Sequence, residues 1–192
     1  SWEKYCPNYK IIKWDESNSP MDIRWIKAAY RSKKFAFVAD YMRFYALYKF
    51  GGIYLDTDML LIKNIDIFLK NKLFAGLEDK DTVSMGILGA EPNNNFIKEC
   101  LNFYNQNEFD FMNPPIITRM VTSKLVQEGF SGIDETKILK NGFVIYKSNY
   151  FYPVHYTQKL LKEEISSYVK ENTFSIHLWN NSWISEFQLI LN

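Results

Sequence analysis

Residues 35–48 form a run of apolar and aromatic side chains that contains only two charges, Asp40 and Arg43. The run predicts a helix, and a helix that is apolar on every side is normally buried in a protein core. Burying an unpartnered charge is strongly unfavourable. Asp40 and Arg43 stand three residues apart, so they share one face of the helix and can pair. The two side chains therefore form either a structural ion pair or the charged lining of a ligand pocket.

The segment after this helix, GGIYLDTDML, places two carboxylates at the end of a predicted strand. Gly51 and Gly52 are typical of a helix end. In extended backbone, side chains alternate, so Asp56 and Asp58 are expected on the same side. Such an oxygen-rich edge suits Mg²⁺ or Mn²⁺, which bind carboxylates together with substrate phosphates and can act as a Lewis acid for a leaving diphosphate.

Composition limits the classes of protein that these features can belong to. With 192 residues and a hydrophobic fraction of 47%, we expect one globular domain that spans residues 1–192. The 23 basic and 22 acidic residues nearly cancel, so nothing indicates a nucleic-acid partner. Cys6 and Cys100 are expected to be free thiols of a reducing compartment. The sequence shows no transmembrane segment and no signal peptide, so we expect a soluble, cytoplasmic protein.

The order of the predicted elements indicates a mixed α/β fold, with a sheet covered by helices. The predicted strands are 9–15, 53–62 with a turn inside it, 72–79, 84–92, 142–147 and 173–179. The predicted helices are 19–33, 33–50, 93–106, 114–129 and 156–172.

The stretch VADYMRFYALYKFGGIYLDTDM resembles the sugar-binding region with a DXD motif that defines glycosyltransferase family 32. The resemblance extends from SWEKYCPNYKIIKWDE to IHLWNNSW. It implies a GT-A fold, with a mixed, mostly parallel sheet flanked by helices. It also implies a nucleotide-sugar donor, a divalent metal (Mn²⁺ or Mg²⁺) and transfer with retention at the anomeric carbon. A UDP-sugar is the favoured donor, with a GDP-sugar as the alternative. The acceptor is a saccharide or lipid-linked saccharide, and the expected role is synthesis of a cell-surface or capsular polysaccharide.

The resemblance also implies roles for individual residues in donor binding. Asp40 would bind hydroxyls of the donor sugar, and Arg43 would reach the sugar and the diphosphate. Asp56 would contact ribose, sugar and metal, and Asp58 would bind the metal directly. Tyr54 would border the nucleotide.

The closing motif near the carboxy terminus carries further implied roles. There His177, Asn181 or Ser182 would complete the metal shell, and Trp183 would donate to the diphosphate.

The sequence departs from the family pattern at its start, because the strand that family members carry before the SWEKYCP segment is missing. We therefore expect an amino-terminally incomplete chain. Peripheral association with the inner face of the plasma membrane is left open.

Two other functions remain open at this point. One is a non-catalytic saccharide-binding relative, and the other is a haloacid-dehalogenase-like phosphatase, in which Asp56 would be the nucleophile. The acidic stretch with Glu78, Asp79 and Asp81 reads as a solvated turn rather than as a source of a catalytic base.

Overall fold

A five-stranded mixed sheet lies at the centre of the computed structural model, which describes residues 1–158 and 164–179. Its strands lie in the order β1 (Gly52–Leu55), β4 (Val83–Ala90), β3 (Leu73–Leu77), β6 (Val144–Tyr146) and β5 (Lys137–Ile138). Among the four pairings, only that of β3 with β6 is parallel. The sheet is therefore mixed, as expected, with a smaller parallel share than the sequence resemblance implies.

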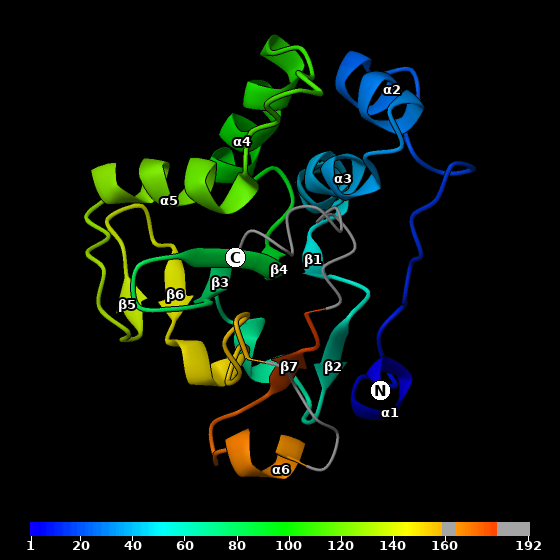
Figure 1. The fold of residues 1–192 in the computed structure, drawn as a ribbon. Helices are drawn as coiled ribbons and strands as arrows, with labels where there is room; N and C mark the ends of the chain where they lie inside the picture. The colour runs from blue at the N-terminus through cyan, green and yellow to red at the C-terminus, as the bar shows by residue number, and fades with distance from the viewer. Residues whose placement is uncertain (159–163, 180–192) are drawn as a thin grey trace.

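A second, two-stranded sheet lies beside the first and pairs β2 (Met59–Leu61) with β7 (Ser175–His177) in antiparallel register. Figure 1 shows β7, from the end of the described chain, lying next to β2, which follows β1 directly. This pairing brings residues near position 60 beside residues near position 176.

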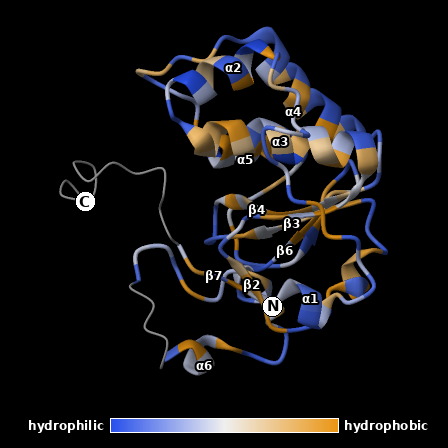
Figure 2. Ribbon diagram, turned by 90° about the vertical axis from the view of Figure 1, so that its right-hand side faces the viewer, coloured by the Kyte–Doolittle hydropathy of each residue, from blue (hydrophilic) through white to orange (hydrophobic). Residues whose placement is uncertain are grey.

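Helices cover one face of the large sheet, and the small sheet and several short turns cover the other (Figure 2). The covering helices are α2 (Arg24–Arg31), α3 (Phe35–Phe50), α4 (Asn95–Gln106) and α5 (Ile117–Gln127). The opposite side holds α1 (Trp2–Tyr5), η1 (Asp66–Phe68), η2 (Ser148–Tyr150) and α6 (Ile165–Tyr168). None of the helices in the described part of the chain is long and apolar enough to cross a membrane.

Helix α3 is buried because apolar residues surround it on every side, as the sequence predicts. Its middle packs between α2, α4 and the sheet, where Phe44 is fully buried. The Trp25 ring of α2 lies edge-on to Tyr104 of α4, with 4.7 Å between ring centroids, and its indole N–H donates to the Phe37 carbonyl at 3.0 Å. The helix ends at Gly51, whose φ of 66° is a conformation that residues with a Cβ rarely adopt.

The core on the opposite side of the sheet is built around Phe68, which is completely buried. Its ring contacts five other aromatic rings, with centroid distances from 4.8 to 6.3 Å; these are Phe74, Tyr146, Tyr150, Phe151 and Phe174. Because Phe174 immediately precedes β7, this aromatic cluster holds the small sheet against the large one.

Most of the predicted elements are confirmed, and two are wrong. Residues 10–15 form irregular chain and no strand, because this stretch runs beside α3, where Trp14 packs on Tyr45 and Phe50, rather than along a sheet edge. Of the helix predicted at 156–172, only the single turn α6 is present in its described part.

Replacing Phe68 with Ala should lower the free energy of unfolding by about 3–5 kcal/mol, because the substitution removes a fully buried ring from the aromatic cluster. Phe111→Ala is the matched control, because Phe111 is 56% exposed, and it should change the stability by less than about 0.5 kcal/mol. Urea unfolding followed by circular dichroism measures both variants. Equal, small losses would show that the cluster does not hold the two sheets together.

Candidate active site

The two carboxylates of the DXD segment come together through a turn that follows β1. Met59 N–H donates to the Asp56 carbonyl at 3.0 Å, which closes a turn over residues 56–59, and Asp56 N–H donates to the Gly86 carbonyl at 2.8 Å. The sequence argument invoked the side-chain alternation of an extended strand, and this was wrong: the strand stops at Leu55. The turn itself brings Asp56 and Asp58 together.

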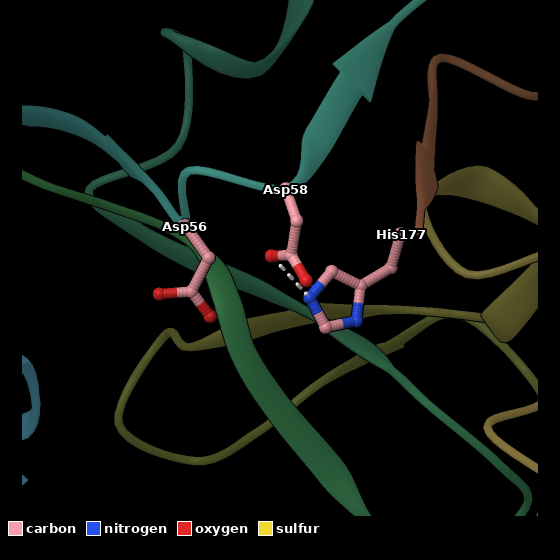
Figure 3. A group of neighbouring side chains, drawn as sticks. All are labelled: Asp56, Asp58 and His177. Carbon is pink, nitrogen blue, oxygen red and sulfur yellow. Dashed lines mark hydrogen bonds and ion pairs between the residues drawn. The ribbon is translucent and has the colours of Figure 1, made fainter. Parts of the chain in front are cut away.

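Pairing of β2 with β7 adds a histidine to the two carboxylates. Met59 lies opposite His177 in the register, and Leu178 N–H donates to the Asp58 carbonyl at 3.0 Å. The imidazole Nε2 of His177 lies 2.9 Å from Oδ1 of Asp58 (Figure 3). One ligand atom from each of Asp56, Asp58 and His177 lies within 4.8 Å of the other two, so a single ion can reach all three.

Arg43 links the buried helix to this group. Its Nη2 donates to Oδ1 of Asp40 at 2.9 Å and lies 3.4 Å from Oδ1 of Asp56, while Nη1 donates to the Met85 carbonyl at 2.6 Å. Tyr54 donates its hydroxyl hydrogen to the same Asp56 oxygen at 2.7 Å, and the Arg43 guanidinium lies 4.9 Å from the centroid of the Tyr54 ring. The ion pair expected from the sequence is therefore continuous with the DXD turn.

Burial governs the protonation of this pair. Burial raises the pKa of Asp40 to about 7, although the nearby Arg43 opposes the shift. For Arg43, burial alone would lower the pKa, but the surrounding Asp56, Tyr54 and Asp40 outweigh it and raise the pKa. The guanidinium therefore remains charged, and Asp40 is the member of the pair that exchanges a proton near neutral pH.

The charges and donor atoms of the site fit a divalent cation. The carboxylates of Asp56 and Asp58 and the imidazole of His177 converge beside the Arg43–Asp40 pair. Two carboxylates and an imidazole are ligands that Mn²⁺ accepts, whereas Mg²⁺ prefers oxygen alone. Within the described residues, the buried Nε of Arg43 and Nδ1 of His177 have no hydrogen-bond partner, so the site retains unused polar capacity.

Three residues that the sequence argument missed, Tyr152, Trp179 and Gly86, lie against the site residues. The Tyr152 hydroxyl accepts from Ile87 N–H at 2.8 Å, and its ring lies 5.8 Å from the His177 ring. The Trp179 ring lies edge-on to the His177 ring, with 4.0 Å between ring centroids. Its position two residues after His177 is the sequence feature from which this contact could have been predicted. At Gly86, an added Cβ would come within 3.2 Å of Oδ2 of Asp56, so glycine leaves room for that carboxylate.

Glu78 is not the fully solvated turn residue that the sequence suggested. It follows β3, pairs with Thr82 through its backbone N–H, and is only partly exposed. Burial raises the pKa of Glu78 to about 7; a hydrogen bond with Ser84 opposes the shift, and Asp79 adds to it. Gly76, Glu78, Ser84 and Gly86 share the face of the sheet that carries Tyr152, because Gly76 pairs with Ser84 and side chains alternate.

The remaining predicted site residues, Asn181, Ser182 and Trp183, lie outside the described residues. Of the predicted residues that the structure describes, all six meet in one group: Asp40, Arg43, Tyr54, Asp56, Asp58 and His177.

Two family models match the chain. One, described as "Glycosyltransferase sugar-binding region containing DXD motif", covers residues 1–75. The other, described as "Alpha 1,4-glycosyltransferase conserved region", covers residues 90–190, which is more than half of the chain. The first match contains the DXD turn and the second contains His177. Together with the mixed sheet flanked by helices, they support a GT-A-like fold.

Similar curated proteins carry related names. The human alpha-1,4-N-acetylglucosaminyltransferase is 29% identical over 151 residues, which cover 74% of this chain and 42% of that protein. The lactosylceramide 4-alpha-galactosyltransferase of Rattus norvegicus is 25% identical over 190 residues, covering 91% of this chain and 51% of the relative. The Mus musculus enzyme of the same name is 26% identical over 153 residues, covering 74% and 40%. The chain thus spans about half the length of these relatives or less. No solved structure matches it significantly.

Replacing Glu78 with Gln should alter how the free energy of unfolding depends on pH. In the wild type, the folded state holds the Glu78 proton up to a pKa of about 7, whereas the unfolded state releases it near the ordinary pKa of 4.5, so the contribution of Glu78 to the free energy of unfolding falls as pH rises between these values. Glu78→Gln lacks this loss. It should therefore gain stability relative to wild type from pH 4.5 to pH 7, by on the order of 1 kcal/mol.

Urea unfolding at several pH values measures this difference, and Asp40 contributes equally to both proteins. Asp81→Asn is the control, since Asp81 is exposed and should follow the wild-type curve. Parallel curves for wild type and Glu78→Gln would contradict the buried position of the Glu78 carboxyl.

Proposed function

Because the chain belongs to glycosyltransferase family 32, we propose that it transfers a sugar from a nucleotide-sugar donor to a saccharide acceptor, with a divalent cation held by Asp56, Asp58 and His177. The observation that carries the proposal is the continuous contact from Asp40 through Arg43 to Asp56, next to the Asp58–His177 pair. Two carboxylates and an imidazole converge here beside the Arg43–Asp40 pair. A cation bound among them would also attract a diphosphate.

The cation is proposed to be Mn²⁺, with Mg²⁺ as the alternative. It would be held by Asp56, Asp58 and His177, and it would supply Lewis-acid stabilisation to the diphosphate leaving group. Asn181 or Ser182 is proposed as a further ligand, and Trp183 as a donor to the diphosphate.

Arg43 and Asp40 are proposed to position the donor sugar. Contacts with Asp40, Asp56 and the Met85 carbonyl hold the guanidinium in place, and its buried Nε has no hydrogen-bond partner among the described residues. Asp40 accepts hydroxyl hydrogens of the sugar when it is ionised. Tyr54 holds Asp56 through its hydroxyl, and it borders the nucleotide. Preset contacts of this kind limit the reorganisation that transfer requires.

We propose that transfer retains the anomeric configuration, with the acceptor hydroxyl entering on the face from which the diphosphate leaves. The relatives' names support α-linked products, and nucleotide-sugar donors of these hexoses are themselves α-linked. A UDP-sugar is the favoured donor, with a GDP-sugar as the alternative.

The proposed acceptor is a saccharide or lipid-linked saccharide of a cell-surface or capsular polysaccharide, and the proposed location is the cytoplasm, at the inner face of the plasma membrane. Cys6 and Cys100 are both buried and unpaired, which supports a reducing compartment. Family membership favours this reading over a phosphatase or a non-catalytic binding protein.

Asp58→Asn should reduce metal-dependent hydrolysis of the donor by about 100-fold or more while the protein remains folded, because the substitution removes a charge that the cation balances. The assay is release of nucleoside diphosphate from a panel of UDP- and GDP-sugars, with Mn²⁺, Mg²⁺ or a chelator. Asp81→Asn serves as control because Asp81 is an exposed carboxylate of the same type. Full activity of Asp58→Asn with Mn²⁺ would refute the cation site.

Asp40→Ala should reduce turnover of the nucleotide sugar about tenfold or more, with little change in the affinity for the nucleoside diphosphate alone, because the substitution removes an acceptor for sugar hydroxyls. Steady-state hydrolysis and calorimetric titration with UDP measure the two quantities. A drop in melting temperature without a selective loss of sugar turnover would instead assign Asp40 to a structural ion pair.

A further inference from the structure

A dense group of cations lies on helix α2 and on the turn that follows it. Between Ile23 and Ala39 the chain carries five basic side chains and no acidic one; these are Arg24, Lys27, Arg31, Lys33 and Lys34. The rest of the chain has 18 basic and 22 acidic residues, so positive charge is concentrated on this segment. The apolar face of α2 is buried through Trp25, Ile26 and Ala29, which leaves Arg24, Lys27 and Arg31 on the exposed face.

Next to α2, the loop between α4 and α5 presents two large apolar side chains to solvent. Phe111 is 56% exposed and Met112 is 78% exposed. The Asp110 carboxylate accepts hydrogen bonds from Met112 N–H at 2.9 Å and from Asn113 N–H at 3.3 Å, which gives the loop tip a defined turn. Neither apolar side chain belongs to the two buried clusters of the described residues.

The loop and α2 are held together, so the cations and the apolar tip belong to one surface. Phe109 packs on Trp25 with 5.1 Å between ring centroids, and Glu108 lies 3.8 Å from Arg24. A shallow hollow of about 360 Å³ lies between the two elements, lined by Arg24, Lys27, Ala28, Arg31, Glu108 and Phe109. Figures 1 and 2 both show α2 and the end of α4 at the same end of the molecule.

We propose that Arg24, Lys27, Arg31, Phe111 and Met112, here called the docking surface, bind the surface of an anionic lipid bilayer. Basic side chains near a membrane are attracted by anionic headgroups, and exposed apolar side chains insert at the boundary between headgroups and acyl chains. The phosphates of a nucleic acid could pair with the cations, but a nucleic acid would offer no apolar environment to the exposed Met112 side chain. The combination of charge and apolar tip therefore favours lipid over a polyanion in solution.

The position of the docking surface suits an enzyme that acts on a membrane-bound acceptor. Helix α3 starts at Phe35, which is itself 56% exposed and packs on Tyr30 of α2. Asp40 lies five residues further on, a rise of roughly 8 Å along the helix. The helix that carries Asp40 and Arg43 would thus begin at the membrane. The docking surface rests on its own residues and not on the catalytic role proposed above.

Sedimentation with vesicles tests the proposal. The full chain should bind phosphatidylcholine vesicles that contain phosphatidylglycerol, should bind pure phosphatidylcholine weakly, and should lose affinity as salt is raised. Lys27→Glu combined with Arg31→Glu should weaken binding about tenfold or more. Phe111→Ser combined with Met112→Ser should weaken it by a similar factor at constant charge.

Lys70→Glu combined with Lys72→Glu is the matched control, because both residues are exposed and lie in the connection from η1 to β3. It makes the same change in net charge and should leave vesicle binding intact. Thermal unfolding checks that each variant is folded. If the charge-reversal variant fails to fold, the Phe111 and Met112 substitutions and the salt dependence of the unmodified chain still test the proposal.

Failure of the unmodified chain to bind anionic vesicles, or equal binding by all variants, would overturn the docking surface. Binding to duplex DNA as tight as to vesicles, and insensitive to Phe111→Ser with Met112→Ser, would replace it with a general polyanion site. Donor hydrolysis without vesicles separates this test from the proposed function. Hydrolysis without vesicle binding removes only the docking surface, and vesicle binding without hydrolysis removes only the enzymatic proposal.

Discussion

The contacts of Arg43 are the interaction on which the arrangement of the site depends. A guanidinium buried in an apolar helix must find acceptors, and it finds them in Asp40 on its own helix, in the Met85 carbonyl of β4 and in Asp56 after β1. These three contacts fix the distance between α3 and the sheet at one point. Because a buried charge without partners is so unfavourable, the helix, the central strand and the DXD turn can pack in few other ways. The contacts that neutralise the buried guanidinium are therefore also contacts that determine how α3 packs on the sheet.

The site also requires that β7, near the end of the described chain, lies beside β2, which follows the DXD turn. His177 and Asp58 are separated by 119 positions in sequence, yet they are hydrogen bonded. Two short strands provide the register, and the ring of Phe68, packed against Phe174, holds the small sheet in place. Glycine at position 86 and the Tyr152 ring complete the surroundings of the carboxylates without filling their space. Residues from five separate stretches of the chain, at positions 40–43, 56–58, 85–86, 152 and 177, thus surround one polar centre.

Sequence reasoning predicted the local parts of this architecture better than the distant ones. The apolar run of α3, its glycine end and the DXD turn are encoded within 25 consecutive residues, at positions 35–59, and each has a local physical signature. The strand predicted at 9–15 was wrong, because the alternation of apolar residues does not show whether a sheet has a free edge with which the segment can pair. Glu78 was misread for a related reason: its local sequence is that of an exposed turn, whereas its carboxyl is partly buried and hydrogen bonded to Ser84 of the neighbouring strand β4. Trp179 stands two residues after His177, so in an extended strand both side chains are expected on the same face. Nothing in the local sequence marks Gly86 or Tyr152 as parts of the site.

The small sheet of β2 and β7 has a consequence for the dynamics of the protein. Strands of three residues in a two-stranded ribbon contribute little stability of their own, so this sheet can open at a lower free energy than the five-stranded sheet. Opening would separate His177 from Asp58, whereas Asp40, Arg43 and Asp56 are joined by contacts that do not involve β7. A ligand that binds only the closed arrangement shifts the equilibrium toward it by mass action. Amide hydrogen exchange along β7 would therefore slow when a ligand occupies the site, and the exchange rate would report the fraction of molecules in which β2 and β7 are paired.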